Sequence, residues 1–317
     1  MADRDVVVVG AGLAGSTAAL FAARHGRSTL VVDAGLVPGG QMFNIARIED
    51  FPGFPQGVAG YDLCPMLQEQ ASTAGAEFRP GAVEALTPTE TGWAVTCEGE
   101  SIEARAVIVA TGSTPRRIGI PGEDRLLGRG ISHCASCDGP IYRERAVAVV
   151  GGGDSALLET LELADHVSSV TVFVRARELR AQQTYAGRVE AAENVTLVYE
   201  TIVEEILGDD VVSGVRTRNV TTGETAELEV AAVFPYIGSE PQTSLLAPHV
   251  ALDPEGRVPT DGWMRTERPG LLVAGEARSE SAAQAVTVAG DGATAAIAVD
   301  RCLATGGWAR LETSVAG

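Results

Sequence analysis

The chain has 317 residues, of which 45% are apolar, and this is enough for two domains that each bury a core of their own. Its formal net charge of -18 at pH 7 argues against nucleic acid or an anionic membrane surface as a partner. All 24 basic residues are arginine, which excludes chemistry that needs a lysine amine, such as Schiff-base formation or the phosphate-binding lysine of a P-loop.

The N-terminal residues and the cysteines predict a cytoplasmic protein. The first five residues are mostly charged and glycines interrupt the apolar run after them, so we expect neither a secretory signal nor a transmembrane span. Five cysteines are few, and odd in number, for a secreted disulfide scaffold. Three of them, Cys64, Cys97 and Cys302, lie alone in apolar or strand-like segments and are expected to fill the core.

The first motif is a glycine turn between a strand and a helix. Four valines at 6–9 precede GAGLAG at 10–15 and an alanine-rich helical stretch. The glycines allow a tight turn and close approach to a pyrophosphate, which the helix N-terminus attracts. The next strand, 28–32, ends in an acid about twenty residues on, which suits a ribose hydroxyl. A glycine turn without a ligand is the alternative. The predicted dinucleotide contacts are Gly10, Gly12, Leu13, Ala14, Gly15 and Asp33.

A long loop, a helix and a small sheet follow. Glycine and proline density over 38–55 predicts an ordered binding loop. Residues 61–75 have the pattern of an amphipathic helix. Alternating apolar runs at 83–86, 93–97 and 102–110 predict an antiparallel sheet that leads into a central strand, which ends at Thr111 and Gly112.

The sequence Cys134-Ala-Ser-Cys137 places two thiols three positions apart, directly before Asp138. As a crosslink such a short loop would add only about 2 kcal/mol. At the start of a helix, however, the partial positive charge and the backbone amides lower a thiol pKa and favour redox chemistry. Half of a zinc site and two buried apolar cysteines are the alternatives, but a zinc site lacks a second ligand pair and no metal is predicted.

The opening pattern then returns. Residues 146–150 read AVAVV and lead into a second glycine turn and helix, and the strand at 169–174 is followed by arginines instead of an acid. Arginines can pair with a 2'-phosphate through forked hydrogen bonds, so the first site suits FAD and the second suits NADPH. A solvated arginine cluster is the alternative. The predicted contacts are Gly151, Gly153, Asp154, Ser155, Ala156, Arg175, Arg177 and Arg180.

Runs at 196–200, 211–217 and 226–234 predict the strands that complete this inserted repeat. From 258 onward the chain returns to the first domain, with a buried strand that closes on Glu276 and a long alanine-rich helix at 282–303. The duplicated strand, glycine turn and helix predict an α/β protein with two Rossmann-like dinucleotide-binding domains.

Motifs in order across almost the whole chain resemble those of the low-molecular-weight thioredoxin reductases. They are GAGLAG with Asp33, PGGQ at 38–41, IEDFPGFP at 48–55, VIVATGSTP at 107–115, CASCDG at 134–139, VVGGGDSA at 149–156, PYIGSEP at 235–241, AGE at 274–276 and QAVTVAGDG at 284–292. The resemblance implies a discontinuous FAD-binding domain at 1–114 and 243–317. It also implies an inserted NAD(P)H-binding domain at 115–242 that carries the cysteines.

The resemblance implies site roles as well. Cys137 would face the flavin, Cys134 would attack the disulfide of a protein such as thioredoxin, and Asp138 would protonate the leaving thiolate. His133 would tune the thiolate, act as a base, or simply adjoin it. A homodimer and a rotation between the domains are implied too. The further FAD contacts are Gly39, Gly40, Gln41, Asp50, Val83, Thr111, Gly112, Gly275, Glu276, Gln284 and Ala285.

Several positions depart from the family pattern. The family's His-Arg-Arg with a later Arg is reduced here to Arg175 and Arg180, Asp154 replaces an Asn, Glu276 replaces an Asp, and Ala283 replaces an Arg. These changes leave two other enzyme functions open. They are a flavin dithiol oxidase that acts on a small-molecule dithiol with oxygen as acceptor, and a ferredoxin-dependent reductase. A flavin-binding redox sensor is the non-enzymatic alternative.

Overall fold

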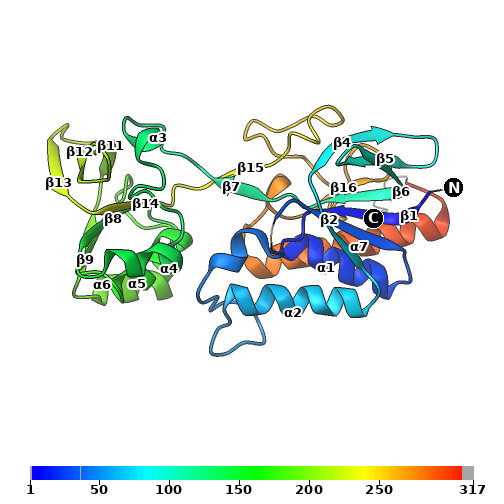
Figure 1. Ribbon diagram of the computed structural model, residues 1–317, viewed down its shortest axis with the longest axis horizontal. Coiled ribbons are helices and arrows are strands. Elements are labelled where there is room, and N and C mark those ends of the chain that lie inside the picture. The colour runs from blue at the N-terminus through cyan, green and yellow to red at the C-terminus, as the bar shows by residue number, and fades with distance from the viewer. Residues whose placement is uncertain (1, 36, 309–317) are drawn as a thin grey trace, which may run out of the picture. The chain divides into compact units, whose positions relative to one another are not determined.

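The computed structural model describes residues 2–35 and 37–308, so residues 1, 36 and 309–317 of the predicted FAD-binding domain lie outside the described residues. The chain forms two compact units: unit 1 runs to Thr114 and resumes at Pro241, and unit 2 is Pro115–Glu240. Each unit contains a parallel sheet with helices packed against it (Figure 1). The predicted α/β class with two Rossmann-like folds is therefore confirmed.

Unit 1 is built on a seven-stranded sheet. Its parallel strands are β3 (Glu77–Pro80), β2 (Thr29–Asp33), β1 (Arg4–Val9), β6 (Glu100–Val109) and β16 (Leu271–Val273). The four valines of β1 are buried because the strand lies between β2 and β6 with both faces covered. The predicted antiparallel runs form β4 (Val83–Pro88) and β5 (Trp93–Cys97), which continue the sheet beyond β6.

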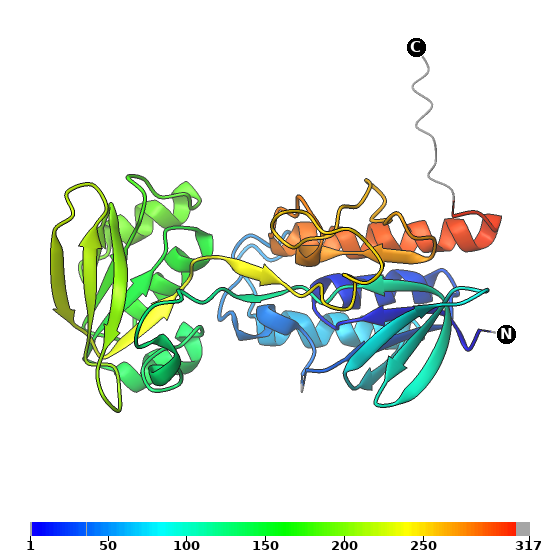
Figure 2. The ribbon, with the colours of Figure 1, turned by 90° about the horizontal axis from the view of Figure 1, so that it is seen from above.

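Three helices of unit 1 lie against this sheet: α1 (Leu13–Arg24), α2 (Gly60–Thr73) and α7 (Ala285–Thr305). Helices α1 and α7 run side by side and share one apolar core with β1 and β6 (Figure 1 and Figure 2). They approach closely at Gly292, where an added Cβ would lie 2.0 Å from the carbonyl oxygen of Ala14. Glycine is required there because any side chain would push the helices apart.

Unit 2 contains two sheets (Figure 2). The parallel sheet has the order β10 (Val195–Val198), β9 (Ser169–Phe173), β8 (Ala146–Val150) and β14 (Ala232–Pro235), with α5 (Asp154–Ala164) and α6 (Gln183–Ala191) as its longer helices. The antiparallel sheet consists of β11 (Thr201–Leu207), β12 (Gly214–Asn219) and β13 (Thr225–Glu229). Short helices α3 (Glu123–Leu126), α4 (Ala135–Asp138) and η2 (Gly139–Tyr142) precede β8.

Some strands differ from the prediction. The expected single strand at 226–234 is two strands: β13 is exposed along its whole length and pairs with β12, whereas β14 is buried beside β8. The backbone N–H of Ala231 donates to Ala146 O at 2.8 Å, so the chain changes sheets at this point without any glycine or proline to mark it. Strands β3 and β11 are absent from the prediction.

The two connections between the units pair with each other, since β7 (Ser113–Pro115) and β15 (Ser239–Pro241) form a two-stranded sheet. Within the described part of the chain, no helix combines the length and the apolar character that crossing a bilayer requires. The predicted core cysteines Cys64, Cys97 and Cys302 are all buried and free, as expected. Burial raises the pKa of the Cys64 thiol to about 11, which makes it unreactive at neutral pH.

The close approach at Gly292 gives a first prediction. Gly292→Ala should lower the free energy of unfolding by about 1–3 kcal/mol, because the new methyl group collides with backbone. Gly290→Ala is the matched control on the same helix: it is exposed, nothing lies within 4 Å of the new Cβ, and stability should rise by about 0.5–1 kcal/mol. Urea unfolding followed by tryptophan fluorescence measures both, since all three tryptophans belong to unit 1. Equal stability of the two variants would contradict the prediction.

Candidate redox site and dinucleotide-binding sites

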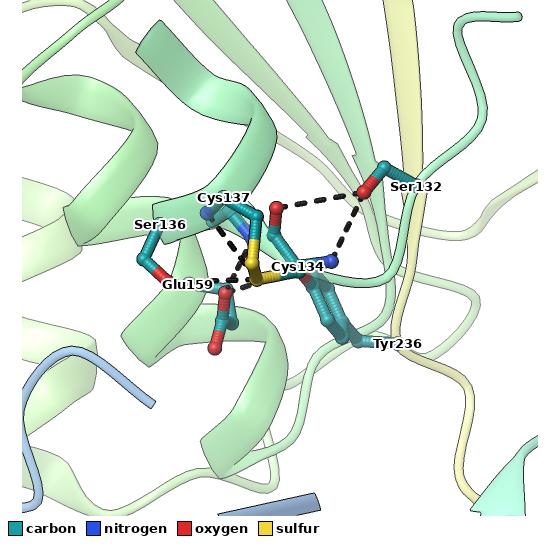
Figure 3. The surroundings of a disulfide bond; sticks show 7 residues. Ser132, Cys134, Ser136, Cys137, Glu159 and Tyr236 are labelled. Carbon is teal, nitrogen blue, oxygen red and sulfur yellow. Dashed lines mark hydrogen bonds between the residues drawn. A yellow bond between two sulfur atoms is a disulfide. The ribbon is translucent and has the colours of Figure 1, made fainter. Parts of the chain in front are cut away.

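The predicted redox cysteines form a disulfide at the start of a helix. Cys134 and Cys137 are bonded, Cys134 is the N-cap of α4, and its Sγ accepts a hydrogen bond from the backbone N–H of Cys137 at 3.2 Å (Figure 3). Cys137 is exposed and Cys134 is half-buried. Because the sulfurs are bonded to each other, neither alternative interpretation, half of a zinc site or two buried thiols, describes this pair. A surface disulfide in a four-residue turn fits thiol–disulfide exchange.

Serine side chains hold the turn around Cys134. Ser132 Oγ accepts from the backbone N–H of Cys134 at 3.1 Å and donates to its carbonyl at 3.4 Å. Ser136 Oγ lies 3.5 Å from Cys134 Sγ. These local bonds fix the backbone before and after the N-cap, so the sulfur keeps its position at the helix start.

Glu159 and Tyr236 complete the site and are missed by the sequence analysis. Glu159, on α5, accepts from the backbone N–H of Ala135 at 2.9 Å and from the hydroxyl of Tyr236 at 3.1 Å (Figure 3). Burial raises the pKa of the Glu159 carboxyl, although both donors oppose the shift. A signal exists in the sequence: Glu159 lies in helical register with the buried Ala156 and Leu163, where an apolar residue is expected.

The two remaining catalytic candidates lie next to the disulfide. Asp138 ends α4, and its backbone N–H donates to Cys134 O at 3.2 Å. The Nδ1 atom of His133 lies 3.0 Å from Pro235 O, so this backbone carbonyl orients the ring. Neither contact assigns a proton-transfer role, and both roles stay predictions.

The FAD contacts predicted in unit 1 gather at the carboxyl ends of its parallel strands. Asp33, at the end of β2, accepts from the backbone N–H of Ala11 at 3.0 Å and from that of Gly35 at 3.1 Å. Gly39 N–H donates to Ala11 O at 2.9 Å, which places the PGGQ segment beside the glycine turn. Gly81 N–H donates to Asp33 O at 2.8 Å, and the strand that begins at Val83 follows directly. This edge of a parallel sheet is where dinucleotides bind.

Three distant segments meet in a polar chain at the same edge. Gln41 Nε2 donates to Ser113 O at 2.7 Å and to Ser113 Oγ at 2.9 Å. Ser113 Oγ in turn donates to Glu276 Oε2 at 2.5 Å. Close by in the chain, Gly275 N–H donates to Asp291, which also pairs with Arg278. Ser113, Arg278 and Asp291 are absent from the predicted set. The partners of Ser113 lie 72 and 163 residues away in sequence, whereas Arg278 and Asp291 are 13 residues apart.

The other predicted FAD contacts have the following places. Thr111 and Gly112 follow β6, and Thr111 Oγ1 donates to Gln242 O at 2.6 Å. Asp50 lies in the loop between Ile48 and Val58, which pair with each other. That loop packs through its apolar residues against Leu13 and Ala285, at the starts of α1 and α7. Gln284 is the N-cap of α7 and forms a capping box with Thr287.

The glycine turns of both units have the shape that a pyrophosphate needs. In the described structure no side chain caps the N-terminus of α1 at Gly12 or of α5 at Gly153. A Cβ at Gly12 would meet only Gly39 O, at 4.0 Å, and a Cβ at Gly153 would meet nothing within 4 Å. Open space in front of uncapped helix amides fits an anionic diphosphate.

The residues predicted to bind NADPH surround the glycine turn of unit 2. The segment after β9 folds back over this turn, since Arg180 N–H donates to Gly152 O at 2.8 Å. Arg175, Arg177 and Arg180 are all exposed, and Arg177 pairs with Glu200 at 2.8 Å. Asp154 is the first residue of α5 and accepts from the backbone N–H of Gln182 at 2.7 Å. A carboxylate therefore stands at the helix start that would receive the pyrophosphate.

Two dinucleotide-binding folds, one of which carries an accessible disulfide, define a disulfide oxidoreductase, and comparisons with known proteins agree. The Pyridine nucleotide-disulphide oxidoreductase family matches residues 4–298. Thioredoxin reductase of Streptomyces coelicolor is 39% identical over 95% of this chain and 94% of its own length. The bifunctional thioredoxin reductase/thioredoxin of Mycobacterium leprae is 41% identical over 95% of this chain and 66% of its own. The crystal structure of Lactococcus lactis thioredoxin reductase superimposes with a TM-score of 0.93 at 36% identity, covering 96% of this chain and 100% of that one.

The chain therefore belongs to the pyridine nucleotide-disulphide oxidoreductase family. It is a flavin-dependent disulfide reductase, as its resemblance to the low-molecular-weight thioredoxin reductases predicts.

The carboxylate at the start of α5 gives a second prediction. Asp154→Asn removes a negative charge where an anionic pyrophosphate is expected, and keeps an acceptor for Gln182 N–H. Because helix-terminus charges are worth about 0.3–1 kcal/mol, the KM for NADPH should fall about two- to fivefold. Asp165→Asn, the same change at the C-cap of α5, is the control and should leave the KM unchanged. Steady-state kinetics at low ionic strength measures both, and an unchanged or higher KM in the Asp154 variant would contradict the prediction.

Proposed function

We propose that this protein passes electrons from NADPH through FAD to the Cys134–Cys137 disulfide and then to a protein disulfide, with thioredoxin as the partner. One observation carries the proposal: an accessible disulfide opens a helix in a unit whose sheet repeats the dinucleotide-binding arrangement of the other unit. The names of the relatives support thioredoxin as the protein that receives the electrons.

Each unit is proposed to hold one dinucleotide. In unit 1 the amides at the start of α1 would hold the FAD pyrophosphate and Asp33 its adenosine ribose. In unit 2 the amides at the start of α5 would hold the NADPH pyrophosphate, with Arg175 and Arg180 near the 2'-phosphate. The bound flavin supplies two-electron exchange between nicotinamide and disulfide. The glycine cradles and the exposed arginines support this assignment.

The family resemblance supports the following thiol steps. Two electrons and two protons convert the disulfide into two thiols. The Cys134 thiolate then attacks a sulfur of the partner disulfide, and the other partner sulfur leaves as a thiolate that Asp138 would protonate. Cys137 attacks the mixed disulfide at Cys134, restores the starting disulfide and releases the reduced partner. His133 is proposed to assist the thiolate from its place beside Pro235.

We also propose a homodimer that works in the cytoplasm. The family resemblance supports the dimer, and the three buried free cysteines fit a reducing compartment. The dithiol oxidase, ferredoxin-dependent and sensor alternatives are not favoured, because the relatives are named thioredoxin reductases.

Anaerobic flavin absorbance gives a third prediction, which tests the proposed direction of electron flow. Saturating NADPH should bleach the bound flavin, and Cys137→Ser should keep this bleaching but lose nearly all reduction of thioredoxin, because the disulfide relay is broken. Cys64→Ser is the control, since this buried thiol has no role in the relay. A flavin that resists NADPH but is bleached by a small-molecule dithiol would replace the proposal with the oxidase. Parallel titrations with NADH establish which nicotinamide is used.

A further inference from the structure

A half-buried carboxylate, that of Glu159, supports the turn that carries the disulfide. Ala135, which is completely buried, donates its backbone N–H to Glu159 Oε2 at 2.9 Å. Ala135 directly follows Cys134, so this bond fixes a negative charge one residue away from the Cys134 sulfur. Tyr236 holds the same carboxylate oxygen through its hydroxyl at 3.1 Å. The carboxylate thus ties together α4, α5 and the segment after β14 (Figure 3).

The groups at the two ends of the turn have opposite effects on the ionisation of the Cys134 thiol. The backbone N–H of Cys137 donates to Cys134 Sγ and favours a thiolate there. The first amide of the helix, which would ordinarily add to this effect, is taken by Glu159, and the carboxylate charge repels a second negative charge nearby. We propose that Glu159 is a positioning residue that fixes the first turn of α4 and whose charge disfavours the thiolate form of Cys134.

The donors around Glu159 match an ionised carboxylate. Burial raises its pKa, but the amide of Ala135 and the phenol of Tyr236 both lower it. The pKa of Tyr236 is raised by burial and by the charge of Glu159, so the phenol stays a neutral donor. Asp138 on α4 and Glu162 one turn along α5 also add negative charge near this pair, and His166 pairs with Glu162 at 3.4 Å. In the described structure, the groups that contact the Glu159 carboxylate, Ala135 N–H and the Tyr236 hydroxyl, carry no positive charge.

This arrangement makes the Cys134–Cys137 pair a stronger reductant. The inference rests on the redox role proposed above for this pair. Reduction by two electrons from the flavin breaks the S–S bond, and the pair takes up one proton if a thiolate remains or two if both thiols form. A reduced form that is stabilised as a thiolate makes a strong oxidant. A carboxylate that disfavours the thiolate has the opposite effect, because it makes the reduced pair less stable and a better reductant.

Alkylation of Cys134 tests the charge directly. In flavin-loaded Cys137→Ser enzyme, the rate of reaction of Cys134 with iodoacetamide is followed from pH 5 to 10 by mass spectrometry, and the buried Cys64, Cys97 and Cys302 serve as internal references. We expect a Cys134 thiol pKa that stays near the ordinary value of about 8.5. Helix N-terminal thiols commonly fall to about 3.5–7.5, so a value below about 7 would overturn the proposal without any further variant.

Glu159→Gln on the same background should lower that thiol pKa by about one unit. The glutamine oxygen can still accept from Ala135, so a purely structural role predicts no change. Tyr236→Phe removes a hydrogen bond but keeps the negative charge of Glu159. Above pH 8, its rates of Cys134 alkylation should therefore equal those of the Cys137→Ser parent. The matched control is Glu162→Gln, because the native Glu162 pairs with His166 at 3.4 Å; this substitution should shift the Cys134 thiol pKa much less. An unchanged profile in Glu159→Gln, or equal shifts in the Glu159 and Tyr236 variants, would overturn the proposal.

A redox equilibrium gives a second readout in enzyme with both cysteines. At fixed ratios of reduced to oxidised glutathione and at pH 9.5, where the Cys134 thiol is ionised in both enzymes, Glu159→Gln should move the pair about tenfold towards the reduced form, which corresponds to about 30 mV for two electrons. An unshifted equilibrium would overturn the proposal. Neither readout uses NADPH or thioredoxin, so failure of the proposed function would appear in turnover alone, whereas failure of this inference would appear in the thiol pKa and the equilibrium.

Discussion

The close approach of backbone to backbone at the first strand-to-helix turn of each unit is the constraint on which the structure depends. In unit 1 a Cβ at Gly10 would lie 2.5 Å from Ala110 O, and in unit 2 a Cβ at Gly151 would lie 2.2 Å from Tyr236 O. Both glycines have positive φ angles, of 103° and 142°. Only glycine allows the chain to pass the end of the neighbouring strand so closely and then to start a helix there.

The third small residue of each glycine motif sets how closely the following helix packs against the turn, and this residue differs between the two units. In unit 1 a Cβ at Gly15 would lie 1.8 Å from Gly10 O, so helix α1 can lie directly on β1. In unit 2 the equivalent position is Ala156, whose Cβ would lie 3.1 Å from a Cβ at Gly151. The two turns nevertheless leave their helix N-termini without a side-chain cap in the described structure, and thus open towards a phosphate.

The disulfide depends on the second of these turns. Helix α5, which starts at the glycine turn, brings Glu159 under Ala135, and the segment after β14 brings Tyr236 to the same carboxylate. The dinucleotide-binding framework therefore also determines the electrostatic surroundings of the Cys134–Cys137 pair. A change in the packing of α5 would alter both the nucleotide site and the thiols, which links the two sites through one rigid helix.

The sequence by itself determined the features that are local. Strand, glycine turn, helix and acid lie within about thirty residues, and so do the two cysteines and the helix that they open, because their physics involves neighbours along the chain. Tertiary structure alone decided the pairings between distant segments. Glu159 meets Tyr236 across 77 residues and Ser113 meets Glu276 across 163, and β11, β3 and the division between β13 and β14 depend on partners in other parts of a sheet. The sequence of a helix does not show whether an acidic side chain is exposed or buried. Only folding brings the hydrogen-bond donors that make its burial possible.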